Sequence, residues 1–245
     1  MTSASPVTRP VALVTGGSCG IGLAVARGLA TGGATVVLVA RDEARVSAAA
    51  ASLVGEGLDA VGFTCDVSDE PAVADLRRRL GPLAEIDVLV NAAAVMSAPM
   101  AKSLRATDDE WQRVMGTNFD GTVRMVRTFG PGMVERRQGR IISLSACLGR
   151  FTGPGLAGGL APYRVSKTAL NAFTRNLAAE LGFGRRGVFA DVVCPGHCRT
   201  DMGGPAAPRS PEQGADTVIW LATRPGVVGQ ESTGLLWEDR APVPW

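Results

Sequence analysis

Short apolar runs alternate with longer amphipathic stretches from Val11 almost to the carboxyl terminus. Such runs are typical of strands that are buried on both faces, and apolar residues spaced three and four apart are typical of helices. The predicted strands are Val11–Thr15, Thr35–Ala40, Ala60–Thr64, Ile86–Val90, Arg140–Ser145, Gly187–Val193 and Gly234–Trp237. The predicted helices are Ile21–Thr31, Glu43–Val54, Glu70–Leu80, Asp108–Glu135, Tyr163–Leu181 and Pro211–Thr223. This alternation predicts a doubly wound, Rossmann-type α/β fold: a three-layer sandwich around a seven-stranded parallel sheet.

The composition limits the size of the fold and the kinds of partner. The chain has 245 residues, 46% of them hydrophobic, which is enough for one domain over residues 1–245. Its formal net charge is only +2, without a long run of one sign, so we expect no nucleic-acid partner. No segment approaches the roughly 18–20 apolar residues of a membrane span, so we expect no membrane partner. Gly- and Pro-rich stretches lie at 152–162 and 203–211, and a segment at about 200–212 is expected to cover the substrate.

The cysteines and the amino terminus bear on cellular location. Residues Met1 to Pro10 lack the apolar centre of a signal peptide. The five cysteines are odd in number and do not form the paired CxxC spacing of a zinc site: Cys19, Cys65, Cys147, Cys194 and Cys198. With a single histidine in the chain, we predict no metal site. These features predict a cytoplasmic protein with reduced thiols.

A glycine-rich turn follows the first predicted strand and precedes the first predicted helix. Gly16, Gly20 and Gly22 are spaced so that the chain can turn tightly and bring backbone N–H groups close to a diphosphate at the helix amino terminus. The position between strand and helix favours dinucleotide binding over a simple turn. The residues expected to contact the cofactor here also include Ser18, Cys19 and Ile21.

The ends of the second and third predicted strands bear on which dinucleotide is bound. Arg41 follows the second strand, where an arginine favours the 2′-phosphate of NADP and an acid favours the ribose of NAD. We therefore predict NADP(H), although Arg41 as a surface side chain and Asp42 as a helix cap are the alternative. Asp66, with Val67 beside it, ends the third strand, where its carboxylate either accepts from the adenine amino group or serves only the turn.

Tyr163 and Lys167 form the most specific pair in the sequence. Tyr163 is the only tyrosine, and the chain otherwise uses arginine, with lysine only at positions 102 and 167. Residues four apart lie on one face of a helix, so the ammonium group is expected to lower the pKa of the phenol. A phenol so tuned gives a proton to a carbonyl oxygen or takes one from an alcohol.

These motifs together resemble the short-chain dehydrogenase/reductase family of the classical type, over nearly the whole chain from Val11. The family's glycine motif matches Thr15–Gly22, and its Tyr-x-x-x-Lys motif matches Tyr163–Lys167. The resemblance also assigns roles at further positions: cofactor contacts at Asn91, Ala92, Ala93, Pro195, Gly196 and Thr200, and a water relay at Asn118. The carboxyl-terminal part is similar to the NADPH-dependent carbonyl reductase branch.

The sequence departs from the family at the catalytic serine. The family's Ser-x-x-Gly places Ala146 at that position, three residues before Gly149, with Ser145 one place early. Ser145 is predicted to take the role if a bulge re-aims it; a different donor such as Cys147, Thr152, water or the substrate is the second possibility. The third is that the protein does not carry out ordinary carbonyl reduction.

The combined prediction is an NADPH-dependent reductase of ketones or aldehydes. Its catalytic residues are Tyr163, Lys167, Asn118 and Ser145, and its substrate is neutral, with aromatic and polycyclic compounds as candidates. The alternatives are an enzyme that holds NADP(H) while catalysing cyclisation, dehydration or epimerisation, and a nucleotide-sensing regulator without catalysis. The resemblance implies a homodimer or homotetramer.

Overall fold

The computed structural model describes residues 9–245, apart from the side chains of residues 154 and 155. The first eight residues of the expected domain, and with them most of the predicted polar amino terminus, lie outside the described part. The strands are β1 (Val11–Thr15), β2 (Thr35–Ala40), β3 (Ala60–Thr64), β4 (Val88–Asn91), β5 (Gly139–Leu144), β6 (Val188–Val193), β7 (Leu236–Glu238) and β8 (Ala241–Val243). The helices are α1 (Gly20–Thr31), α2 (Glu43–Gly55), α3 (Glu70–Leu80), α4 (Asp108–Met115), α5 (Gly121–Arg136), α6 (Ala161–Glu180) and α7 (Pro211–Thr223).

The strands form one sheet in the order β3-β2-β1-β4-β5-β6-β7-β8. Seven strands are parallel, which confirms the predicted Rossmann-type sheet, and the eighth pairs antiparallel with β7. The prediction of seven strands was one too low. Ala241–Val243 is three residues long and contains a proline, so it carries no readable apolar alternation.

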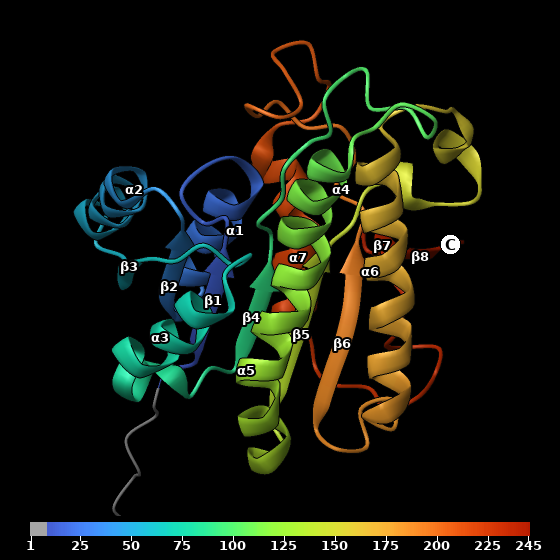
Figure 1. Ribbon diagram of the computed structural model, residues 1–245. Helices are drawn as coiled ribbons and strands as arrows, with labels where there is room; N and C mark the ends of the chain where they lie inside the picture. The colour runs from blue at the N-terminus through green and yellow to red at the C-terminus, as the bar shows by residue number, and fades with distance from the viewer. Residues whose placement is uncertain (1–8) are drawn as a thin grey trace, which may run out of the picture.

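Two helical layers cover the sheet, as Figure 1 shows. Apolar side chains of α1, α2 and α7 pack with Ala12, Val14 and Val36 on one face. Those of α3, α5 and α6 pack with Leu13, Val37 and others on the opposite face. Consecutive residues of one strand thus enter different cores, which is why the strands read as continuous apolar runs.

The long helix predicted over Asp108–Glu135 is interrupted in the structure. A π-helical turn, η2 (Gly116–Asp120), separates α4 from α5. Single π-helical turns are frequent at functional sites because the extra residue shifts the register of the side chains and carbonyls around it. Here the interruption contains Asn118, one of the predicted site residues.

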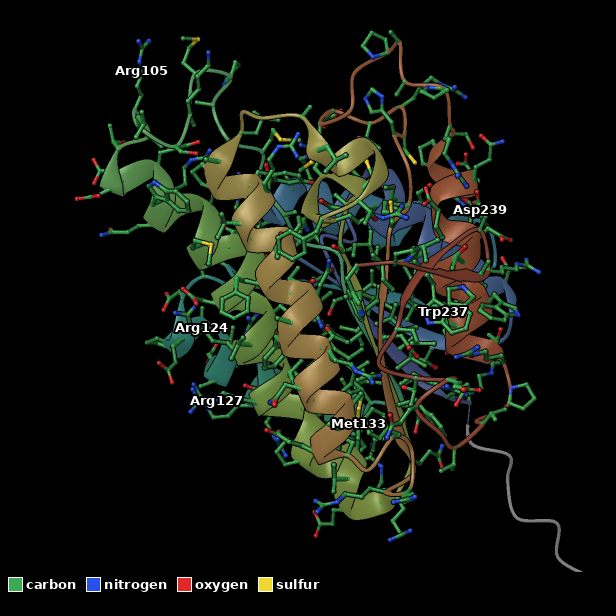
Figure 2. All side chains as sticks on the ribbon, turned by 90° about the vertical axis from the view of Figure 1, so that its right-hand side faces the viewer. Arg105, Arg124, Arg127, Met133, Trp237 and Asp239 are labelled. Atoms are coloured by element: carbon green, nitrogen blue, oxygen red, sulfur yellow. The ribbon has the colours of Figure 1, made fainter. Side chains whose placement is uncertain are left out.

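The loops that follow the parallel strands gather at one end of the molecule, at the top of Figure 1. Parallel pairing brings Thr15, Asn91 and Ser143 into one row at this edge, with Thr15 opposite Asn91 and Asn91 opposite Ser143. Figure 2 shows Arg105 at the outer tip of the loop that follows β4 at this end. Ligands of open α/β sheets bind at this carboxyl edge.

Candidate active site

A cavity of about 380 Å³ lies at the carboxyl edge of the sheet. It brings together most of the predicted residues: Gly16, Ser18, Cys19, Gly20, Ile21, Gly22, Arg41, Asp66, Val67, Ala92, Ala93, Ser145, Tyr163, Lys167, Pro195 and Thr200. Three predicted residues, Asn91, Asn118 and Gly196, are not among those lining the cavity. Segments from both halves of the sequence therefore build one elongated site.

The glycine turn is shaped by close backbone approach. Gly16 has a φ of 66°, and a Cβ there would lie 2.9 Å from the Ala92 carbonyl. A Cβ on Gly22 would lie 2.2 Å from the Gly16 carbonyl oxygen. Helix α1 begins at Gly20 without a side-chain cap and without an acidic residue in its first turn. Its first N–H groups therefore face the cavity without a competing side chain, which fits the diphosphate of a dinucleotide.

Thr15 connects this turn to the end of β4. Its Oγ1 accepts hydrogen bonds from the N–H groups of Ala92 and Ala93, both at 3.1 Å. The neighbouring Asn91 is buried, and its Nδ2 donates to Ser143 Oγ at 3.4 Å. The Oδ1 of Asn91 is buried and has no hydrogen-bond partner. Asn91 thus lies behind the cavity wall rather than in it.

Two arginines flank the end of the cavity next to α2. Arg41 and Arg45 both line it, and Arg45 forms an ion pair with Asp201 at 2.9 Å. Asp42 accepts a hydrogen bond from the Arg45 N–H at 3.0 Å. Asp42 therefore caps α2, which is the alternative role predicted for it from the sequence. Arg45 was not predicted to be a site residue; its signal in the sequence is the spacing of four residues from Arg41 across the start of a helix.

Asp66 lines the cavity and also serves its own turn. Its Oδ1 accepts from the N–H of Ser68 at 2.8 Å and from the Ser68 hydroxyl at 2.6 Å. Asp66 therefore stabilises its own turn, which was the alternative role predicted for it. Its contact with adenine stays a prediction.

Tyr163 and Lys167 lie in the first turns of α6, against the end of β5. Both are buried, and the Lys167 Nζ lies 5.6 Å from the centroid of the Tyr163 ring. The same Nζ donates to the Leu144 carbonyl oxygen at 2.7 Å. The backbone N–H of Tyr163 donates to Ser97 Oγ at 2.8 Å, which ties the start of α6 to the loop after β4.

The expected effect of the lysine on the phenol is not found in the structure. Burial raises the pKa of Tyr163, and the charges of Cys147 and Cys194 raise it further. Burial also lowers the pKa of Lys167 to about 8. The direction for Tyr163 is opposite to the lowered tyrosine pKa predicted from the sequence, because burial of the phenol disfavours the phenolate. Tyr163 is therefore a neutral phenol at working pH, a state suited to donating a proton.

Asn118 lies behind Lys167 rather than beside the cavity. Its Oδ1 accepts from the Val95 N–H at 2.7 Å, and its Nδ2 donates to the Val95 carbonyl and to Ser166 Oγ, both at 3.0 Å. Its side chain is thus fully used in joining η2 to the loop after β4 and to α6. The water relay implied by the resemblance stays a prediction.

Ser145 follows β5, and its hydroxyl is buried. It donates to Asn171 Oδ1 at 2.7 Å, and Asn171 Nδ2 donates to the Gly149 carbonyl oxygen at 3.1 Å. Ser145 lines the cavity, whereas Ala146 does not. The single hydroxyl proton of Ser145 is committed to Asn171, so donation to a substrate would require this bond to break. The catalytic role of Ser145 stays a prediction, and this geometry counts against it.

The loop after β6 closes over the glycine turn. A Cβ on Gly20 would lie 3.0 Å from Thr200 Cγ2, which shows how closely the two segments approach. His197 Nε2 lies 2.8 Å from the Gly203 carbonyl oxygen, so the histidine shapes this loop. The base of the loop is held by Arg209, which pairs with Asp239 at 2.5 Å. Figure 2 shows Asp239 above Trp237, toward the end of the molecule where this loop lies.

Two other kinds of site have no support within residues 9–245. No group of three or more His, Cys, Asp or Glu side chains is placed there to hold a metal ion. In the same part of the chain, every helix is too short or too polar to cross a membrane.

This fold, with Tyr163 and Lys167 at the carboxyl edge of a parallel sheet beside a glycine turn, defines a nucleotide-dependent oxidoreductase of the Rossmann class. A family model for short chain dehydrogenases matches residues 10–210. The chain is 36% identical over 203 residues to "Dehydrogenase/reductase SDR family member 4" of Rattus norvegicus, covering 82% of this chain and 70% of that protein.

Solved structures agree. A variant of actinorhodin polyketide ketoreductase with NADPH gives a TM-score of 0.80 at 31% identity, covering 94% of this chain and 95% of that one. A 3-oxoacyl-(acyl-carrier protein) reductase from Brucella melitensis with bound NAD gives 0.82 at 30% identity, covering 98% and 95%. The chain belongs to the short-chain dehydrogenase family and is an oxidoreductase that acts on CH–OH and C=O groups with a nicotinamide cofactor.

Proposed function

We propose that the protein is an NADPH-dependent reductase of ketones or aldehydes. The observation that carries the proposal is the layout of one cavity, with Tyr163 and Lys167 at one end and Arg41 and Arg45 at the other. A phenol whose pKa is raised by burial supports reduction, the direction in which the enzyme must supply a proton.

The cofactor choice rests on the two arginines. A 2′-phosphate carries about two negative charges, and a guanidinium matches its oxygens with paired donors. Arg45 is held by Asp201 in the described structure, in an exposed pair that contributes little stability. A phosphate group competes with Asp201 for Arg45, while Arg41 forms no ion pair with a carboxylate of residues 9–245 that would have to be displaced.

In the proposed reaction, a bound reduced nicotinamide supplies the hydride. Tyr163 gives its phenolic proton to the carbonyl oxygen, and Lys167 orients the ribose and stabilises the phenolate that is left. The main-chain N–H groups at the start of α1 would hold the diphosphate, and Asp66 and Val67 would border the adenine. Asn118 holds η2 against α6, so the position of Lys167 is fixed before the cofactor arrives.

The substrate is proposed to be neutral and largely apolar. The cavity lining includes the apolar side chains of Val95, Leu144 and Met202, and Leu144 lies beside Lys167. The loop after β5 lies at the same end of the molecule (Figure 1), and its residues Phe151 and Leu156 are exposed. A ketoreductase of polyketide synthesis and a 3-oxoacyl reductase are among the similar structures, which supports ketones of extended carbon chains or aromatic polyketides as candidates.

The test is a panel of ketones and aldehydes, neutral and carboxylate-bearing, with NADPH or NADH. The proposal expects NADPH oxidation with formation of an alcohol, highest for neutral apolar substrates. Turnover that depends on a substrate carboxylate would contradict the substrate class, and faster turnover with NADH would contradict the cofactor choice.

A second candidate function is a non-redox step on the same scaffold with NADP(H) bound. It is favoured by one observation: the family's serine position holds Ala146, and the neighbouring hydroxyl of Ser145 is bonded to Asn171. Product formation from a carbonyl substrate without consumption of NADPH would support this candidate over the first.

We also propose an oligomeric state and a cellular location for the protein. Helices α4, α5 and α6 are proposed to form the faces of a homodimer or homotetramer, to be measured by analytical ultracentrifugation. Figure 2 labels Arg124 and Arg127 of α5; Arg127 is exposed, whereas the Nη1 of Arg124 is buried. The free state of all five cysteines supports a reducing, cytoplasmic location, which fractionation of cells tests.

A further inference from the structure

Two thiols meet beside Tyr163, on the side of the sheet edge next to β7. Cys147 begins the short 3-10 helix η3 (Cys147–Gly149), and Cys194 follows β6. The ends of β5 and β6 are held together, with the Ser145 N–H donating to the Val193 carbonyl oxygen at 2.8 Å. Cys147 is half-buried and packs against the apolar cluster that contains Cys194 and Leu236. Neither cysteine has a role in the proposed reduction.

The two sulfur atoms are chemically unequal. The interaction between the two cysteine side chains lowers the pKa of Cys147 and raises that of Cys194. The positive charge of Arg150 lowers the pKa of Cys147 further, while burial and Glu238 oppose the shift. Arg150 is itself paired with Glu238 at 2.8 Å, and Cys194 Sγ lies 3.7 Å from the other oxygen of Glu238. The pair therefore joins a thiol that ionises more readily than usual to a neighbouring thiol that keeps its proton, the two partners of disulfide exchange.

The pair is coupled to the reaction site in two ways. A negative charge on either sulfur opposes ionisation of the Tyr163 phenol. Burial is the largest cause of the raised pKa of Tyr163, and both cysteines raise it further. The short helix η3 also packs tightly on α6, because a Cβ on Gly149 would lie 2.7 Å from Lys167 Cβ. The Gly149 carbonyl oxygen accepts from Asn171 Nδ2 at 3.1 Å. A shift of η3 toward β6 must therefore move the surroundings of Lys167.

We propose that Cys147 and Cys194 are a modification site at which a low-molecular-weight disulfide reversibly closes a protein disulfide and lowers turnover. The Cys147 thiolate attacks one sulfur of the small disulfide, forms a mixed disulfide and releases one small thiolate. The Cys194 thiol loses its proton and attacks the Cys147 sulfur, releasing the second small thiol. The protein loses two electrons and the single proton of Cys194, and the small disulfide becomes two small thiolates, which take up that proton and one from water.

The experiment treats the full-length protein with oxidised glutathione and follows three readouts. Peptide mass spectrometry identifies the linked residues, thiol titration counts the remaining free cysteines, and the Kd for NADPH and the rate of NADPH oxidation report on the site. Cys147→Ser and Cys194→Ser are the test variants. Cys198→Ser is the matched control, because Cys198 is also buried and also follows β6. Its thiol donates to the Pro195 carbonyl oxygen and not to another cysteine. Each variant is compared with its own untreated activity.

The expected result is a peptide linking Cys147 to Cys194, a loss of two of the five free thiols, and a loss of turnover that follows the cross-link and is reversed by dithiothreitol. Cys198→Ser should behave like the wild type, and both test variants should resist. A mixed disulfide between glutathione and Cys147 that is never displaced by Cys194 would overturn the proposed pair. A complete cross-link that changes neither turnover nor the Kd for NADPH would overturn its control of the site.

Only the effect on turnover rests on the proposed reductase function. If the untreated protein oxidised no NADPH, the reductase proposal would fail on its own, while the linked peptide and the Kd for NADPH would still decide the modification site.

Discussion

The two halves of the carboxyl edge achieve their geometry by different means. At the ends of β1 and β4, the shape comes from backbone: Gly16 and Gly22 admit contacts that a Cβ would block, and Thr15 holds the chain after Asn91 in place. At the end of β5 and the start of α6, it comes from buried polar side chains, with Lys167 on the Leu144 carbonyl oxygen and Ser145 on Asn171.

This difference explains where the chain departs from its family. A turn built from backbone contacts tolerates almost no change, because any side chain would collide. A side-chain network can lose one hydroxyl and keep its shape, and Ala146 stands where that hydroxyl is expected. The cofactor half is therefore expected to behave as the family does, and the reaction half is where this protein's own properties are decided.

The largest effect should come from the phenol. Tyr163→Phe removes the proton donor while leaving the ring and its packing, so the rate of NADPH oxidation should fall by roughly 10²–10⁴-fold. The Kd for NADPH, measured by fluorescence titration, should change little. A variant that retained most of the wild-type rate would place the proton donor elsewhere in the reaction half.

The next effect should be a gain. Ala146→Ser restores a hydroxyl at the family's position. Ala146 itself does not line the cavity, so the gain requires the new side chain to turn into it. Because one such donor contributes roughly 10²–10³ in rate, turnover should then rise, by up to that factor. Steady-state kcat with the best ketone of the panel measures it. An unchanged or lower kcat would show that the site already has its donor, and a matching loss in Ser145→Ala would identify Ser145 as that donor.

The cofactor half is tested by its arginines. Arg41→Ala and Arg45→Ala should each raise the Kd for NADPH by about 10- to 100-fold, the equivalent of a charge-assisted hydrogen bond, with little effect on NADH. Arg186→Ala is the control, since Arg186 is exposed just before β6 at the opposite edge of the sheet. Equal losses for both cofactors would contradict the assignment of the 2′-phosphate to these residues.

The pH dependence should report Lys167. Its pKa is lowered to about 8, so it is charged below that pH and neutral above it, while Tyr163 keeps its proton because burial raises its pKa. The kcat/KM for NADPH should therefore decline above about pH 8, by about tenfold for each further pH unit. Lys167→Arg should remove the decline, since a guanidinium stays charged. A decline that persists in this variant would belong to another group.

The smallest effect concerns stability. Ser145→Ala removes the donor to Asn171 Oδ1 and leaves a buried acceptor without a partner, so the free energy of unfolding should fall by about 1–3 kcal/mol. Denaturant titration measures it, and Ser103→Ala, in the exposed loop after β4, is the control. A stability equal to that of the control would show that water replaces the lost hydroxyl.

Apolar periodicity was enough to predict most of the fold. The bounds of β1, β2, β3, α3 and α7 agree with the prediction, because a run of apolar residues marks each strand and a proline in the first turn marks the start of each of the two helices. The π-helical turn at Gly116–Asp120 and the antiparallel β8 left no such pattern. One depends on tertiary contacts of Asn118 and the other is too short to read.

The site was predicted in its members and less well in its chemistry. Motif spacing brought Tyr163, Lys167 and the glycine turn together, since parallel strands end at one edge. The raised pKa of Tyr163 could not be predicted from spacing, because it depends on how deeply the phenol is buried and on sulfur atoms far away in sequence. The same holds for Arg45, whose place at the cavity depends on the direction of α2.

Hydride transfer itself is the central claim, and isotope transfer measures it most directly. NADPH deuterated at nicotinamide C4 is incubated with the protein and the best carbonyl substrate, and the product is examined by mass spectrometry and NMR. The account predicts an alcohol that carries deuterium on the former carbonyl carbon. A product that forms without deuterium, while the labelled cofactor remains reduced, would contradict it and favour the non-redox function.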